Sequence, residues 1–147
     1  MRFVCDVMLG KLAKYLRILG FDAIYLRNVD FLEQYARDED PPLFLTRRQK
    51  RFAYKKTTYI TSENVWEQVK EIRKLIKPFI NSKSVLGRCI NCNLLLVDVE
   101  KESIEHRVPE FVFHTYDSFK MCPQCQRVYW AGTHTEKMAQ LIAAVRS

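Results

Sequence analysis

Short apolar runs alternate with amphipathic stretches through the first eighty residues of the chain. Four runs have the length and composition of buried β-strands, at residues 3–5, 23–26, 43–45 and 58–60. Each run is followed by a stretch that contains apolar residues at helical spacing or a marked charge cluster. This repeated rhythm is typical of an α/β fold, in which helices cover both faces of a parallel sheet.

The ends of the helices are also marked in this region. An apolar stripe over residues 8–19 predicts the first helix, and Gly20 stands where many helices end on a left-handed residue. Asn28 and Ser62 are placed to cap the two helices that follow, the second of which runs to Pro78.

A polar stretch, residues 81–84, separates this region from a second and smaller one. Beyond it, apolar runs predict three further strands, at residues 94–97, 111–113 and 128–130. Thr133 and Glu136 have the spacing of a capping box and predict a final helix over residues 138–145.

The second region contains two Cys-x-x-Cys pairs, thirty-three residues apart. Four thiolates suit a tetrahedral structural zinc site, and disulfides are the alternative. Asp6 and Lys11 interrupt any apolar run of the kind found in a signal peptide, so we expect a cytoplasmic chain with reduced thiols. The sequence therefore predicts a zinc ribbon with a C-terminal helix, whose zinc ligands are Cys89, Cys92, Cys122 and Cys125.

The chain is basic, with a formal net charge of +7. Residues 1–80 hold 16 Lys or Arg against 10 Asp or Glu, a balance of +6. We expect nucleic acid to be the partner, and no membrane partner, because no apolar stretch approaches the roughly 18 residues that span a bilayer. The densest cluster places Phe52 and Tyr54, which could stack on bases, among six cations, Arg47, Arg48, Lys50, Arg51, Lys55 and Lys56. A solvated helix face is the alternative.

Three carboxylates stand at strand-to-helix junctions of the predicted sheet. Asp6 directly follows the first strand, Asp30 lies near the start of the second helix, and Glu63 is expected in the first turn of the third. Ligands of open α/β sheets gather at the carboxyl ends of the strands, and converging acids bind Mg²⁺ or Mn²⁺. Such ions activate water for attack on a phosphodiester. The alternative is that Asp30 and Glu63 only complement helix dipoles.

Several segments together resemble a known family. These are residues 6–22, 44–47, 107–109 and 129–134, in addition to the two cysteine pairs. They are similar to Mut7-C RNase domains, which are PIN-like nucleases. The resemblance implies a PIN-like nuclease domain over residues 1–80 and a zinc ribbon plus C-terminal helix over residues 86–147. It also implies metal-dependent cleavage of RNA, with Asp6 as the first acid and Asp30 and Glu63 near later ones.

One position departs from the family pattern. Arg48 stands where the family usually has an aspartate, directly after a Thr-Arg pair at the end of the third strand. A guanidinium cannot bind a divalent cation and repels one nearby. Three functions therefore stay open: a ribonuclease using Mg²⁺ or Mn²⁺ on single-stranded RNA, an inactive RNA-binding module, and an adaptor that docks a protein through its ribbon. PIN-like domains often pair, which leaves a homodimer open as well.

Other conspicuous residues favour structural roles. Cys5 lies on the first strand and is expected in the core, and Tyr129 and Trp130 are expected in the core of the ribbon. His134 has no visible base or nucleophile partner, so a structural hydrogen bond is the favoured interpretation.

Overall fold

Four parallel strands form the first unit of the computed structural model, which describes residues 1–133 and 135–146. They are β1 (Arg2–Cys5), β2 (Asp22–Tyr25), β3 (Leu43–Thr46) and β4 (Thr57–Tyr59), in the order β2-β1-β3-β4. Val4 of β1 is aligned with Ile24 of β2 and with Phe44 of β3. The parallel sheet predicted from the alternating apolar runs is confirmed.

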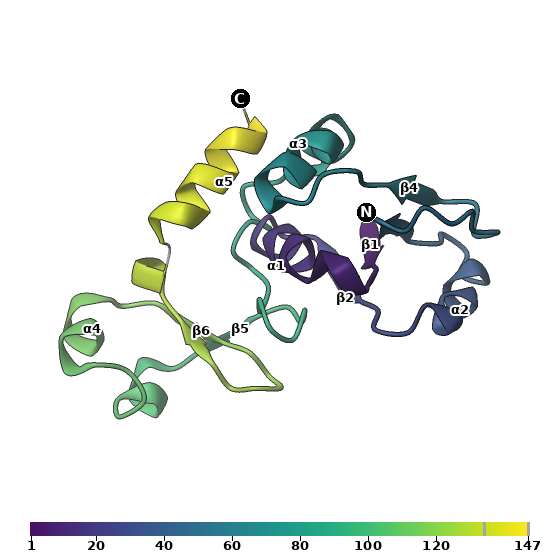
Figure 1. Cartoon of the computed structure of the whole chain (residues 1–147). Coiled ribbons are helices and arrows are strands. Elements are labelled where there is room, and N and C mark those ends of the chain that lie inside the picture. The colour runs from purple at the N-terminus through teal and green to yellow at the C-terminus, as the bar shows by residue number, and fades with distance from the viewer. Residues whose placement is uncertain (134, 147) are drawn as a thin grey trace.

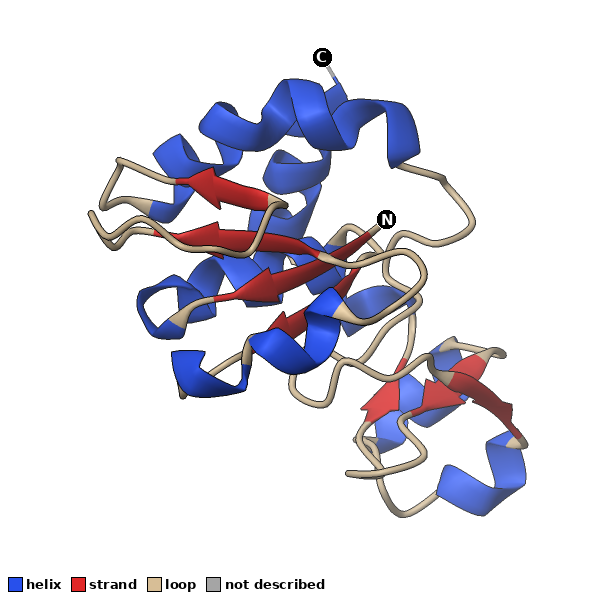
Figure 2. Ribbon diagram, turned by 90° about the vertical axis from the view of Figure 1, so that its right-hand side faces the viewer, coloured by secondary structure: helices blue, strands red, loops and turns tan. Residues whose placement is uncertain are grey.

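Helical segments cover both faces of this sheet (Figure 2). Phe3 and Leu45 point into one core, which also holds the apolar sides of the first and third helices. Val4 and Phe44 point into the core on the opposite face, under the second helix and the connection between β3 and β4. This alternation follows from the period of two residues along a strand. The helices are α1 (Gly10–Ile18), α2 (Glu33–Ala36) and α3 (Val65–Ile76).

The helix ends agree only partly with the sequence. Gly20 has a φ of +97°, as expected of a left-handed residue after a helix, and the Asn28 side chain accepts a hydrogen bond at the next turn. Ser62 was the wrong cap for α3, because Asn64 accepts the N–H groups of Trp66 and Glu67. An N-cap must lie directly before the first helical residue, and α3 begins later than predicted. Short 3₁₀ turns complete the unit: η1 (Val7–Leu9), η2 (Val29–Phe31) and η3 (Lys77–Phe79).

The second unit has its own antiparallel sheet. It consists of β5 (Val97–Val99), β6 (Phe119–Met121) and β7 (Val128–Tyr129), with η4 (Lys101–Ile104), α4 (Glu110–Thr115) and η5 (Ala131–Thr133) in the connections. The strand predicted at 94–97 begins three residues later, and the strand predicted at 111–113 is wrong, because this segment forms α4. A three-residue apolar run does not distinguish a strand from one turn of helix.

The chain returns to the first unit through its last helix, α5 (Glu136–Arg146). Thr135 caps this helix, because its hydroxyl accepts the N–H of Met138 at 3.2 Å, and the predicted capping box is wrong because Glu136 is already the first helical residue. His134 lies outside the described residues. Leu141 and Val145 are buried in the core shared with α1 and α3, and Figure 1 shows α5 beside α3. Among the described helices, none has the length and hydrophobicity needed to cross a bilayer.

The first cysteine pair is fastened to the edge strand β2. Arg17 of α1 is buried, and its guanidinium donates to the carbonyl of Ala23 at 2.9 Å and to that of Ile90 at 2.7 Å. Asn93 accepts the Ala23 N–H at 3.0 Å and donates to the Asp22 carboxylate at 2.6 Å. These contacts and α5 join the two units. The domain boundary expected between residues 80 and 86 therefore stays a prediction.

Replacement of Arg17 tests this attachment. Arg17→Met keeps the length of the side chain but leaves two carbonyls without their charged donor, so we expect a loss of about 2–3 kcal/mol in the free energy of unfolding. Urea unfolding followed by circular dichroism measures it. Lys14→Met removes the same charge from the exposed side of α1 and is expected to stay within about 0.5 kcal/mol of the wild type. Equal losses in the two variants would contradict the proposed attachment.

Candidate functional site

The four predicted zinc ligands lie together. The Sγ atoms of Cys89, Cys92, Cys122 and Cys125 are all within 4.8 Å of one another. The Sγ atoms of Cys89 and Cys125 are 3.8 Å apart. A regular tetrahedron with Zn–S bonds of about 2.3 Å has sulfur separations of about 3.8 Å. The donor set and its spacing therefore fit a structural zinc ion held by these four thiolates.

The two cysteine pairs have the same local structure. Asn93 and Gln126 follow the second cysteine of each pair and have left-handed φ angles of 65° and 63°. Their N–H groups donate to the carbonyls of Cys89 and Cys122, both at 2.9 Å. The second cysteine of each pair donates its own N–H toward the first sulfur, at 3.4 and 3.5 Å. Equal spacing in the sequence has thus produced two equivalent knuckles.

Hydrogen bonds favour the ionised, thiolate form of Cys89. Burial raises the pKa of its thiol, but the Tyr129 hydroxyl and the Cys92 N–H lower that pKa to about 6. Burial, hydrogen bonds with the other sulfurs and the charge on Cys89 raise the pKa of Cys92 to about 12. Four thiolates at this spacing repel one another, so all four ionise together only around a cation.

We expect one zinc ion per chain, and Cys89→Ser is expected to release it and unfold the second unit. Thiolates bind zinc and thiols do not, so the stabilisation by zinc is complete at higher pH and is lost as the pH falls through the pKa values of the metal-bound thiols. Elemental analysis and a chromogenic chelator measure the zinc. Cys5→Ala, which alters a buried thiol outside the tetrad, is expected to keep the ion. Full zinc content in Cys89→Ser would contradict the assignment.

Asp6 is the best-defined of the three predicted acids. Its side chain is 0% exposed at the end of β1. One carboxylate oxygen accepts the Thr46 hydroxyl at 2.7 Å and Nε of Arg48 at 2.8 Å. The other accepts the Val7 N–H at 2.7 Å and Nη2 of Arg48 at 3.4 Å. Arg48, which departs from the family pattern, therefore binds both oxygens of the first acid.

The other two acids are exposed to solvent. Asp30 lies in η2, where its N–H is bound by the side chain of Asn28. Glu63 precedes the cap of α3 instead of lying in its first turn, and its side chain is 90% exposed, 3.9 Å from Nη2 of Arg47. In the part of the chain that the structure describes, the cysteine tetrad is the one group of three or more side chains arranged to hold a metal.

These residues do not fit a catalytic Mg²⁺ or Mn²⁺ ion. Such an ion needs carboxylate oxygens that converge and are free to coordinate it. Both oxygens of Asp6 already accept hydrogen bonds from Arg48, and the positive guanidinium stands where the cation would have to approach. The assignment of Asp6, Asp30 and Glu63 to catalysis stays a prediction that this geometry does not favour.

The basic segment, residues 47–56, connects β3 to β4. Lys50, Arg51 and Lys55 are exposed. Lys56 donates to the Asp40 carboxylate at 3.1 Å, and Arg47 faces Glu63. Lys50, Arg51 and Lys55 are thus exposed, with Nζ of Lys50 near the Phe52 ring, whereas the other three cations of the segment contact acids of this chain.

The aromatic residues of this segment are not placed for base stacking. Phe52 and Tyr54 pack edge-on against Phe44, with ring centroids 5.2 and 6.2 Å away. Tyr54 is buried and Phe52 is half-buried, with Nζ of Lys50 5.5 Å from its ring centroid, so this packing does not favour the expectation that these rings stack on bases. Phe31 and Tyr59 are exposed instead, by 61% and 44%. Phe31 ends η2 and Tyr59 ends β4.

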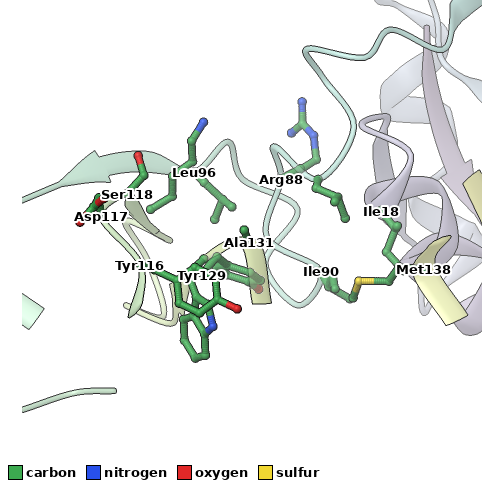
Figure 3. A pocket seen from close by; sticks show the side chains of 13 residues that line it. Ile18, Arg88, Ile90, Leu96, Tyr116, Asp117, Ser118, Tyr129, Ala131 and Met138 are labelled. Atoms are coloured by element: carbon green, nitrogen blue, oxygen red, sulfur yellow. The ribbon is translucent and has the colours of Figure 1, made fainter. Parts of the chain in front are cut away.

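A cavity of about 470 Å³ lies along the seam between the two units (Figure 3). Ile18 of α1, Ile90 of the first knuckle and Met138 of α5 line one side, and Tyr116 and Tyr129 of the second unit line the other. The seam is therefore partly hollow. The second unit is held through its first knuckle and through α5, where the chain returns to the core.

Comparison with known proteins extends this picture. A family model described as "Mut7-C RNAse domain" matches residues 1–142 and so covers both units. Neither a curated protein nor a solved structure matches the chain. The match spans the sheet, the Asp6–Arg48 pair, both cysteine knuckles and the start of α5.

Proposed function

Because this chain belongs to the Mut7-C RNase domain family, we propose that it binds single-stranded RNA and that Arg48 replaces the catalytic metal ion at Asp6. The family supports a nuclease-type, PIN-like domain and thereby RNA as the partner. Of the interpretations left open by the sequence, the geometry at Asp6 favours the RNA-binding module over the metal-dependent ribonuclease.

The ion pair between Asp6 and Arg48 carries this proposal. Asp6 is buried, and a buried carboxylate needs a counter-charge. In a metal-dependent nuclease a divalent cation would provide part of that charge. Here the guanidinium provides it, at 2.8 Å from the carboxylate. Since the site is already neutralised, a metal ion would have to displace Arg48 before it could bind.

Arg48 can also contact phosphate while it is paired. Nε and Nη2 face Asp6, and the side chain is still 37% exposed. A guanidinium has five N–H donors, so the donors that do not face the carboxylate can bind a phosphate oxygen. Arg48 would then hold the RNA backbone beside Asp6 without activating water.

The exposed cations of residues 47–56 extend this surface. Lys50 and Arg51 follow Arg48 closely in the chain, and Lys55 lies next to the start of β4; all three are exposed and can neutralise phosphates. Phe31 and Tyr59 offer exposed rings on which unpaired bases can stack. Stacking of this kind requires bases that are not paired in a duplex, so single-stranded RNA is the partner that these side chains suit.

Restoring the family's acid at position 48 tests the role of the arginine. We expect the wild type to bind labelled RNA equally well in EDTA and in Mn²⁺, without cleavage. Arg48→Asp should bind RNA more weakly in EDTA and should gain thermal stability on addition of Mn²⁺, by about 2.7 kcal/mol at a hundred times the dissociation constant. If Asp6 coordinates Mn²⁺ in the Arg48→Asp variant, this variant should also gain RNA cleavage in the presence of Mn²⁺.

Arg51→Asp is the matched control, because it makes the same change at an exposed position of the same segment. Its thermal stability should not respond to Mn²⁺. Chelator-sensitive RNA cleavage by the wild type, abolished in Asp6→Asn, would overturn the proposal and establish the ribonuclease instead.

Charge reversal in the basic segment tests RNA binding itself. Arg51→Glu combined with Lys55→Glu should weaken binding at least tenfold. It should also lower the slope of log affinity against log salt by about 1.4, since each phosphate contact with a single strand contributes about 0.7. Fluorescence anisotropy over a salt series measures both quantities. Lys74→Glu with Lys83→Glu, two exposed cations outside the segment, is the control, and equal effects in the two pairs would contradict a specific surface.

A further inference from the structure

A basic groove of about 650 Å³ lies between α1, the edge strand β2 and the first cysteine knuckle. Its lining includes four cations, Lys11, Lys14, Arg17 and Arg27, and the described residues that line it include no Asp or Glu. The groove is separate from the basic segment of residues 47–56, which connects β3 to β4 on the other side of β1. We call it the α1 groove.

Three of these cations can reach a ligand. Lys11 and Lys14 are exposed and three residues apart, so they lie on the same face of α1. Arg27 is exposed just beyond the end of β2. Arg17 differs, because its guanidinium is engaged with the carbonyls of Ala23 and Ile90. Its charge interacts with Cys89 and Cys92 and would offset half of the net charge of −2 that four thiolates and one zinc ion carry.

The remaining walls suit a nucleotide chain. Tyr25 is fixed by its hydroxyl, which donates to the carbonyl of Val7 at 2.6 Å, and its ring lies beside Gly10. Asn91 of the first knuckle is exposed at the opposite end. The groove thus combines an aromatic ring, cations and an amide, which are the groups that bind bases and phosphates of single strands.

We propose that the α1 groove holds a second stretch of the RNA backbone and that the first zinc knuckle forms one wall of the RNA-binding surface. This inference rests on the proposed function. The end of the α1 groove that Gly10 and Tyr25 line adjoins η1, and η1 directly follows Asp6. From there α1 spans about 14 Å, at 1.5 Å per residue, toward the knuckle. A strand bound at the Asp6–Arg48 pair can therefore continue along α1.

The decisive variant combines Lys11→Glu with Lys14→Glu. The probe is a fluorescein-labelled oligouridine of twenty nucleotides, and anisotropy is recorded over a salt series. We expect at least a tenfold loss of affinity and a salt slope lower by about 1.4, which corresponds to two lost phosphate contacts. Lys74→Glu with Lys83→Glu should bind like the wild type. Thermal unfolding of each variant shows whether the fold is kept.

A second variant tests the knuckle with almost no change of shape. Asn91→Asp introduces one negative charge at the end of the groove, at a position that is not a zinc ligand. We expect weaker RNA binding at an unchanged zinc content. If this variant binds RNA with wild-type affinity, the knuckle is not part of the RNA-binding surface, and that part of the inference is overturned.

The outcomes separate the two proposals. If the wild type does not bind the oligouridine, the proposed function fails, and the inference falls with it. If the wild type binds and only the variant at Arg51 and Lys55 is weakened, RNA binding stands and the α1 groove is overturned. A glutamate-rich peptide is the alternative probe. If the wild type binds this peptide more tightly than RNA, and the Lys11 and Lys14 variant no longer binds it, the groove belongs to a protein partner instead.

Discussion

A buried negative charge at the end of β1 constrains the whole carboxyl edge of the sheet. Asp6 is removed from water, so the protein must supply donors and a positive charge around it. Thr46 and Arg48 supply them from the end of β3, which the parallel pairing places directly beside β1. A metal ion and a guanidinium are alternative ways to meet the same electrostatic requirement. Under the function proposed here, the choice between them would separate a nuclease from an RNA-binding protein of the same fold.

Much of the architecture followed from local sequence signals. Apolar runs bounded by polar residues identified all four parallel strands, because the runs alternate regularly with helical stretches, which is the pattern of an α/β fold. Paired cysteines identified the metal centre, since their spacing fixes the geometry of each knuckle. Local sequence signals predicted the structure less well at the helix ends and in the second unit. There Asn64 competes with Ser62 as a cap, and the run at 111–113 forms a helix whose Phe111 faces solvent.

The candidate site was harder to predict because it depends on the directions of side chains. The sequence showed that Arg48 would repel a cation, but not that its guanidinium would turn onto a carboxylate forty-two residues away. It placed Asp30 and Glu63 at the correct end of the sheet without showing that both extend into solvent. Likewise, Phe52 and Tyr54 appeared as free rings among cations, because sequence alone does not show which side of a loop covers the core.

The return of α5 to the first core makes the ribbon an insertion and not an appendage. The chain leaves the α/β unit after η3, forms the ribbon, and comes back to bury Leu141 and Val145 beside α1 and α3. Both ends of the ribbon are therefore anchored to a core that is built from apolar side chains outside the cysteine tetrad. Loss of zinc would then open a tethered loop within a folded protein, and reloading would start from a chain whose two ends are already held near each other.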